Sequence, residues 1–278
     1  MAYLLATLAA VCYGAADFTG GMVTRRVAAI PVVLLSQATG LVMVAVILPM
    51  LSTEAPRAAD LWWGAGAGLA GGVGVGLLYH ALAIGTMSVV APTTAVAAVA
   101  IPVITSIAMG ERPGPLALAG ILLGIAAIAL VSRQTPHAPT TARSSGLGVA
   151  LAAGVAIGLF LLALAQTRAA SGLWPLLTAR LASVTLFAVV ATVRRRSLRM
   201  PGRLAALAVG GGALDMLANT LYLLAAQLGP LSPVATLSSL YPASTVLLAR
   251  AVLGERLNGW QTAGVAAALV AVLLIVRS

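Results

Sequence analysis

The stretch SVVAPTTAVAAVAIPVITSIAMGERP (residues 88–113) returns 144 positions later as SPVATLSSLYPASTVLLARAVLGERLN (residues 232–258). Each segment begins with serine, continues as an apolar run that contains proline, and closes with Gly-Glu-Arg, at 110–112 and at 254–256. Self-similarity at a fixed spacing indicates that one structural unit occurs more than once in a chain. The repeat therefore predicts two copies of one unit.

Outward from this repeat, the chain divides into apolar runs, each about as long as a membrane-spanning helix. We expect ten spans, at 3–23, 30–50, 61–84, 88–109, 115–132, 146–167, 173–193, 204–227, 231–252 and 259–276. The runs are apolar all round and too long for barrel strands, and apart from closed barrels only helices satisfy their own backbone in lipid. The expected fold class is an all-α integral membrane protein.

Each copy contains five of these spans. The first copy occupies residues 1–132 and the second occupies 146–278, with a polar linker at 133–145 between them. Because five is odd, the second copy enters the membrane from the side opposite to the first. This arrangement is an inverted-topology repeat, which is typical of secondary transporters.

The composition excludes a soluble protein. Hydrophobic residues make up 61% of the chain and charged residues 8%, and the mean hydropathy is +1.07, whereas soluble domains carry about 25% charged residues. The net charge is +10, and all basic side chains other than histidine are arginines. They lie mostly between apolar runs, where arginine anchors helices at the cytoplasmic face. We therefore expect a lipid bilayer and no nucleic acid as partner.

The N-terminal run and the cysteine content also limit the function. The first run lacks a basic n-region and a cleavage site, so we interpret it as a retained span. The single cysteine, Cys12, allows no internal disulfide and no zinc cluster. No metal and no cofactor are expected, and because the polar residues form no catalytic set, the chain is not predicted to be an enzyme.

A G-x-G-x-x-G pattern occurs at 66–71, within LWWGAGAGLAGGVGVGLLYHAL (61–82). A dinucleotide-binding loop needs a preceding strand and an acidic residue about 20 positions later. Here a polar loop that ends in Asp60 precedes the pattern, and the next acidic residue is Glu111. Small residues every four positions instead allow helices to approach closely, and four glycines follow that spacing: Gly64, Gly68, Gly72 and Gly76. These glycines predict helix packing.

At an offset of 143, the second copy replaces two of these glycines by polar residues. Gly72 corresponds to Asp215 and Gly76 to Asn219, and Tyr79 corresponds to Tyr222. The spacing i, i+4, i+7 puts the three second-copy residues on one helix face. A carboxylate in a membrane helix rarely faces lipid. We expect this face to look into the bundle or into a wet cavity.

Few ionisable residues lie well inside the spans: Asp17, His80, Arg180 and Asp215. One interpretation is that they line a substrate path, where Arg180 holds a substrate carboxylate and Asp17 or Asp215 holds an ammonium group or a proton. The alternative is a structural ion pair, for example between Arg180 and Asp215, that locks helices together. His80 alone is also explained by helix packing.

Three prolines interrupt spans four and nine: Pro92, Pro102 and Pro242. Proline removes a helical hydrogen bond and bends the helix. Hydroxyls and freed carbonyls around Pro242 are candidates for substrate contact; a curved packing helix is the alternative. The complete set of candidate substrate-binding residues is Asp17, Gln37, Tyr79, His80, Arg180, Asp215, Asn219, Ser238 and Tyr241.

Together these features resemble the EamA family of the drug/metabolite transporter (DMT) superfamily. The resemblance rests on the two five-span copies, the Gly-Glu-Arg closures, Ser-Pro-Val-Ala at 232–235, Tyr-Pro at 241–242 and YGAADFTGG at 13–21. It covers nearly the whole chain and implies export or exchange of small metabolites, amino acids or drugs by alternating access, coupled to protons in some relatives. The first copy has Ala97-Ala98 in place of Tyr-Pro, so we expect the two halves to bend differently.

The arginines also predict an orientation. Ten lie in the loops after odd-numbered spans and four lie on the other side. The positive-inside rule then places the odd loops in the cytoplasm and both termini outside the plasma (inner) membrane. Glu111 and Glu255, at helix ends, are interpreted as parts of interfacial turns.

The function expected from these observations is a secondary active transporter, acting as an exporter or exchanger, with its site near the midplane between the repeats. Two other functions remain open at this point. A lipid or lipid-carrier flippase predicts a cavity that opens sideways to lipid. A non-transporting membrane scaffold predicts buried charges that pair with one another and leave no wet cavity.

Overall fold

A computed structural model describes residues 1–51, 55–84, 87–131, 146–195, 197–253 and 258–277. Within these ranges every regular element is a helix, which confirms the all-α fold. The helices are α1 (Ala2–Thr24), α2 (Ala29–Ile47), α3 (Ala58–Ile84), α4 (Met87–Ala108), α5 (Pro115–Val131), α6 (Leu147–Ala165), α7 (Trp174–Val193), α8 (Gly202–Leu228), α9 (Leu231–Ser238), α10 (Tyr241–Leu253) and α11 (Gly259–Val276). The expected linker at 133–145 and the second Gly-Glu-Arg closure lie outside the described residues.

The helices begin and end within a few residues of nine of the ten expected spans. Six stretches of the described chain are long and apolar enough to cross a membrane: α1, Ala29–Met50 (α2 with the 3-10 turn that follows it), α3, α6, α7 and α8. Three shorter stretches are also apolar: Thr93–Ala108, Pro115–Leu130 and Thr262–Val276. The protein is therefore a multi-pass membrane protein.

The expected span at 231–252 consists of two helices, so the interruption at its proline is a full break and not only a bend. In the structure α9 ends at Ser238 and α10 begins at Tyr241. The break follows from Pro242, which has no N–H to donate to the carbonyl of Ser238. Helix α4, the counterpart in the first copy, has alanines at 97–98 and is continuous. The expected difference in bending between the two halves is confirmed.

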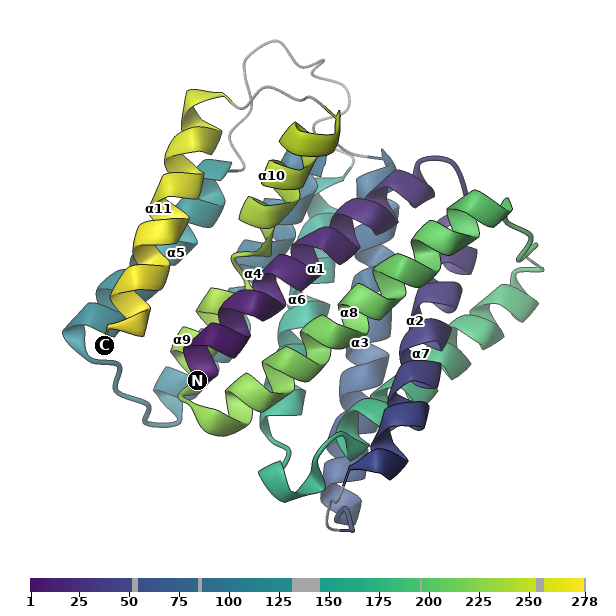
Figure 1. The fold of residues 1–278 in the computed structure, drawn as a ribbon, viewed down its shortest axis with the longest axis horizontal. Helices are drawn as coiled ribbons and strands as arrows, with labels where there is room; N and C mark the ends of the chain where they lie inside the picture. Colours follow the sequence, from purple (N-terminus) through teal and green to yellow (C-terminus); the bar gives the residue numbers. More distant parts are fainter. Residues whose placement is uncertain (52–54, 85–86, 132–145, 196, 254–257, 278) are drawn as a thin grey trace.

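The helices of the two copies interleave in one bundle (Figure 1). Helix α1 packs against α8, and its counterpart α6 packs against α3. Helices α5 and α11 lie side by side along one edge. Helix α1 begins on the side where both chain ends lie, whereas α6 begins on the opposite side (Figure 1). The first helices of the two copies therefore run in opposite directions.

The glycine ridge of α3 packs against α7. A Cβ atom at Gly68 would overlap the backbone of Ala179, and one at Gly76 would lie 2.6 Å from the ring of Phe187. A Cβ atom at Gly66, in contrast, would have nothing within 4 Å. The prediction that these ridge glycines serve helix packing is confirmed, and Gly66 of the nucleotide-like pattern is not part of the contact.

The same close contact recurs between α8 and α2. A Cβ atom at Gly212 would lie 2.5 Å from the carbonyl oxygen of Ser36. Gly212 follows Gly68 by 144 positions, and Ala179 follows Ser36 by 143. Equivalent positions of the two copies therefore make equivalent contacts, which is the packing signature of an internal repeat.

The Gly-Glu-Arg closure of the first copy ends α4 and joins it to the second copy. Gly110 has a φ of +101°, which glycine adopts without strain. The N–H groups of Gly110 and Glu111 bond the carbonyls of Ile107 and Ser106, which is a Schellman motif. The Glu111 carboxylate then accepts the N–H of Ser232 at the start of α9, 3.2 Å from each oxygen. The interpretation of Glu111 as an interfacial turn residue missed this contact.

Candidate functional site

A cavity with a volume of about 60 Å³ lies between helices of both copies. That volume is enough for a few water molecules. Its polar lining comes from α1, α2, α7, α8 and the α9–α10 break: Tyr13, Asp17, Gln37, Arg180, Ser183, Asp215, Asn219, Ser238, Ser239 and Tyr241. Within the described residues, no group of three His, Cys, Asp or Glu side chains is placed to hold a metal ion.

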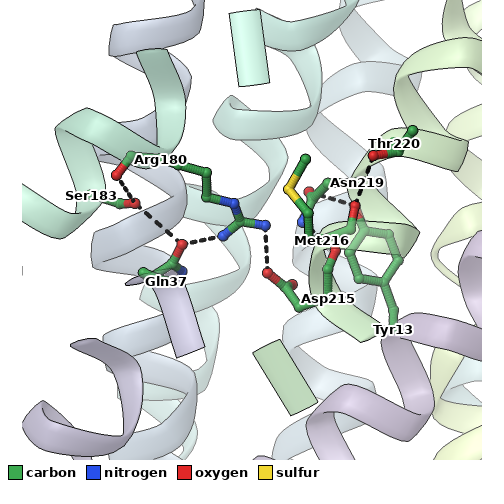
Figure 2. Close-up of polar contacts among 8 residues, drawn as sticks. All are labelled: Tyr13, Gln37, Arg180, Ser183, Asp215, Met216, Asn219 and Thr220. Carbon is green, nitrogen blue, oxygen red and sulfur yellow. Dashed lines mark hydrogen bonds and ion pairs between the residues drawn. The ribbon is translucent and has the colours of Figure 1, made fainter. Parts of the chain in front are cut away.

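Arg180 on α7 is the centre of the polar network (Figure 2). One terminal nitrogen of its guanidinium donates to Oδ2 of Asp215 on α8 at 2.6 Å, and the other donates to Oε1 of Gln37 on α2. The side chains of Arg180 and Asp215 are only 7% and 15% exposed. Removing one partner of such a pair leaves an uncompensated buried charge. The pair both joins two helices and lines the cavity.

Small residues around Arg180 fix the position of its guanidinium. A Cβ atom at Gly40 would lie 2.9 Å from Nε of Arg180, so glycine makes room for the side chain on α2. The hydroxyl of Ser183, one turn after Arg180, donates to the same oxygen of Gln37 at 3.2 Å. The guanidinium is therefore held by groups from α2, α7 and α8.

Asn219 links α8 to α1 one turn after Asp215. Its Oδ1 accepts a hydrogen bond of 2.8 Å from the hydroxyl of Tyr13, and its Nδ2 donates to the carbonyl of Asp215 at 2.6 Å (Figure 2). Tyr222, the third residue on this face, donates to the carbonyl of Leu161 on α6 at 2.9 Å. The expected face does look into the bundle, but Tyr222 contributes to packing and not to the cavity wall.

Three groups of the lining have no hydrogen-bond or ion-pair partner among the described residues. Asp17, one turn after Tyr13 on α1, makes no hydrogen bond or ion pair with any described residue. The hydroxyls of Ser239 and Tyr241 are buried and have no hydrogen-bond partner in the described part of the chain. Because buried polar groups without partners cost free energy, these are the positions where water or a ligand gains most.

Seven of the nine candidate residues line the cavity, and two do not: Asp17, Gln37, Arg180, Asp215, Asn219, Ser238 and Tyr241 line it, whereas Tyr79 and His80 are absent from its wall. Tyr79 is buried against α1, where a Cβ atom at Gly20 would overlap its phenol. His80 is exposed on α3. Consecutive helical residues point about 100° apart, so these two neighbours face different surroundings.

Sequence reasoning missed three polar residues of the lining: Tyr13, Ser183 and Ser239. Each is one turn or one residue from a candidate that was chosen. Tyr13 precedes Asp17 by four positions and Ser183 follows Arg180 by three, and such neighbours share a helix face. That spacing was the available signal. Ser239 joins the lining because of the break before Pro242, which the sequence indicated only as a bend.

A second buried carboxylate lies where α3 begins. Asp60 is 3% exposed and accepts hydrogen bonds from the Arg168 backbone (3.1 Å), from its guanidinium (2.9 and 3.1 Å), from Ser171 Oγ (2.5 Å) and from the Arg57 N–H (3.2 Å). These bonds tie the first copy to the α6–α7 connection of the second. The sequence indicated only that Asp60 ends a polar loop.

The fold and this cavity define a multi-pass helical membrane protein in which related copies surround a polar space. A family profile described as the EamA-like transporter family matches residues 1–133 and 144–277. The chain therefore belongs to the EamA family of membrane transporters, within the DMT superfamily.

Two further comparisons complete this result. No curated protein sequence matches the chain. One solved crystal structure is similar over 98% of this chain and 95% of its own, with a TM-score of 0.73 and 20% sequence identity. At that identity the similarity shows the fold alone.

Proposed function

We propose that the protein is a secondary active transporter that exports or exchanges a small metabolite, amino acid or drug by alternating access, with the polar cavity as its substrate site. The observation that carries the proposal is the convergence of seven expected residues, from helices of both copies, on one cavity. Substrate sites of inverted-repeat transporters lie at the interface between the repeats, near the bilayer midplane. The opposite directions of α1 and α6 (Figure 1) support such a repeat, with ten spans.

Alternating access requires the helices around the cavity to move. A space of about 60 Å³ holds only a few waters, so a metabolite enters when the walls separate. The α9–α10 break borders the cavity and interrupts the backbone hydrogen bonds of span nine. Hinges are short segments at element ends that absorb backbone rotation. The α9–α10 break is the candidate hinge.

The two alternative functions are less well supported. A scaffold predicts that the buried charges pair off, whereas Asp17 has no partner among the described residues. A flippase predicts a cavity open to lipid. The apolar groove on the outer surface between α3 and α7, around Leu69 and Leu181, shares no lining residue with the polar cavity.

Protons are the proposed coupling ion. A carboxylate without a partner in a low-dielectric cavity is stabilised by binding a proton or another cation. Asp17 meets that description, whereas Asp215 is already paired with Arg180. Asp17 is therefore the proposed proton carrier.

Counterflow into proteoliposomes tests the proposal. Vesicles containing the purified protein are loaded with unlabelled compounds, and uptake of labelled amino acids, amines and metabolites is followed with and without a proton gradient. We expect saturable counterflow of at least one compound, lost in Arg180→Ala and Asp215→Asn variants that remain folded. Thr7→Ala, whose hydroxyl bonds only its own helix, is the control. Unchanged counterflow in both folded variants, or none across the panel, would contradict the proposal.

A further inference from the structure

One carboxyl group of the cavity lining has no counter-charge among the described residues. Arg180 and Asp215 neutralise each other at 2.6 Å, and Gln37 accepts the other terminal N–H of the guanidinium. Asp17 lines the same cavity and has no ion-pair partner in the described chain. Asp17 is therefore the carboxyl group with which a cation can pair.

The remaining polar groups of the cavity suit an N–H donor. The hydroxyl oxygens of Ser239 and Tyr241 are buried, lack partners among the described residues and line the cavity with Asp17. The rings of Tyr13 and Tyr241 meet edge to face with centroids 6.4 Å apart. Aromatic rings attract cations that lie over their faces. Three kinds of group, a carboxylate, free hydroxyl oxygens and aromatic rings, thus favour a cation that carries N–H groups.

The rest of the wall favours an apolar body. Apart from the polar residues and glycines, the lining is aliphatic or aromatic: Val75, Leu78, Ile157, Phe160, Leu161, Leu176 and Ala179. Burial of apolar ligand surface against such side chains supplies affinity, whereas the few polar groups set orientation and specificity.

We infer that the cavity binds a protonated amine with an apolar body, whose ammonium group pairs with Asp17 and donates to the hydroxyls of Ser239 and Tyr241. The inference rests on the proposed function, because it names the substrate class of the same site. A carboxylate ligand meets no free cation here, since Arg180 already pairs with Asp215. To bind, it must break that pair or lie beside Asp17, and discrimination of this kind is a difference between two affinities.

Four probes with one phenyl body and different charges test the inference: 2-phenylethylamine, 2-phenylethanol, phenylalanine and 3-phenylpropionate. The readout is the Tm of the purified protein in detergent, because a ligand that binds the folded state raises Tm with its concentration. We expect the amine to raise Tm by several degrees at saturation. The neutral, zwitterionic and anionic probes are expected to have little effect. A larger shift with phenylalanine or 3-phenylpropionate would overturn the inference.

Variants of Asp17 locate the effect. Asp17→Asn is expected to lose at least tenfold in apparent affinity for the amine, whereas Asp17→Glu and the control Thr7→Ala retain it. An amine shift of equal size in Asp17→Asn would overturn the assignment of this carboxylate. The comparison of the four probes uses the unaltered protein, so it decides the ligand class even where a variant fails to fold.

Different experimental results would contradict the transport function and the ligand class. Amine binding that depends on Asp17, with no counterflow of any compound, would contradict transport and support the ligand class. Counterflow of a carboxylate compound that the amine does not inhibit would support transport and overturn the ligand class.

Discussion

At the residue scale, the buried charges of Arg180 and Asp215 stabilise each other, so the loss of one charge destabilises the protein more than the loss of both. Arg180→Met leaves the carboxylate of Asp215 buried and unpaired, and loss of one partner of a buried pair costs about 3–5 kcal/mol. We expect the double variant Arg180→Met/Asp215→Asn to have a higher Tm than Arg180→Met alone, because no unpaired charge remains. Thermal unfolding in detergent measures both. Additive decreases in Tm would contradict this coupling.

Residue types inside the spans predicted most of the polar residues that line the cavity. Polar side chains in apolar helices are few, and lipid excludes them, so seven of the nine that were chosen meet in one place. The exceptions are instructive because they concern direction. Tyr79 and His80 are adjacent in α3, but their side chains point in different directions: Tyr79 is buried against α1, whereas His80 is exposed. Distances between side chains of different helices cannot be read from a sequence, so it remained open whether Arg180 pairs with Asp215 or faces a ligand.

At the scale of elements, the contact between α3 and α7 depends on the ridge glycines, such as Gly68, and not on Gly66. We expect Gly68→Ala to lower Tm by several degrees, because its methyl group overlaps the backbone of Ala179 and overpacking costs about 1–3 kcal/mol. Gly66→Ala, two residues earlier and in open space, is the matched control. It is expected to leave Tm unchanged or raised, since alanine favours helix. Equal effects of the two substitutions would contradict the packing account.

The clamp formed by Asp60 and Arg168 closes one face of the molecule only. At offsets of 143 and 144, the equivalent positions on the other face are Arg203 or Leu204 and Arg25 or Thr24. None of these is acidic, so no equivalent ion pair forms there. Within the described residues, this clamp therefore occurs at the face where α3 begins and α6 ends, without an equivalent at the other face.

Loss of this clamp has a local readout. Asp60→Asn weakens the acceptor of the Arg168 and Ser171 hydrogen bonds, so we expect amide hydrogen exchange in the α6–α7 connection to become at least several times faster. Hydrogen exchange with mass spectrometry of peptides that cover residues 166–173 measures this. Arg203→Gln, exposed at the opposite face, is the control. Unchanged exchange in Asp60→Asn would show that the clamp does not hold the connection.

Helix length and helix continuity differ in how well the sequence predicts them. The lengths of the apolar runs predicted nine spans correctly, because a helix needs about 20 residues to cross the bilayer. Whether a span is continuous is harder to predict, because proline is compatible with both outcomes. Pro102 lies within the continuous α4, whereas Pro242 follows a break.

At the scale of the whole molecule, the arginines predict the orientation in the membrane. Several lie exposed where α1 and α7 end and α8 begins: Arg25, Arg26, Arg194, Arg195 and Arg203. This face is expected in the cytoplasm, with both termini outside. A C-terminal alkaline phosphatase fusion should then be active and a C-terminal green fluorescent protein fusion dark. The reverse pattern would place the termini inside. Reporters inserted after residue 195 are the internal control and should behave oppositely.

Labelling inside the cavity shows whether the substrate passes through the space between the copies. Ser239→Cys, in a Cys12→Ala background, puts one thiol where a buried hydroxyl has no partner among the described residues. Ser197→Cys, exposed between α7 and α8, is the control. We expect a bulky maleimide at position 239 to abolish counterflow, substrate to slow this labelling, and the label at 197 to have no effect. Full counterflow by protein that is completely labelled at position 239 would contradict this expectation.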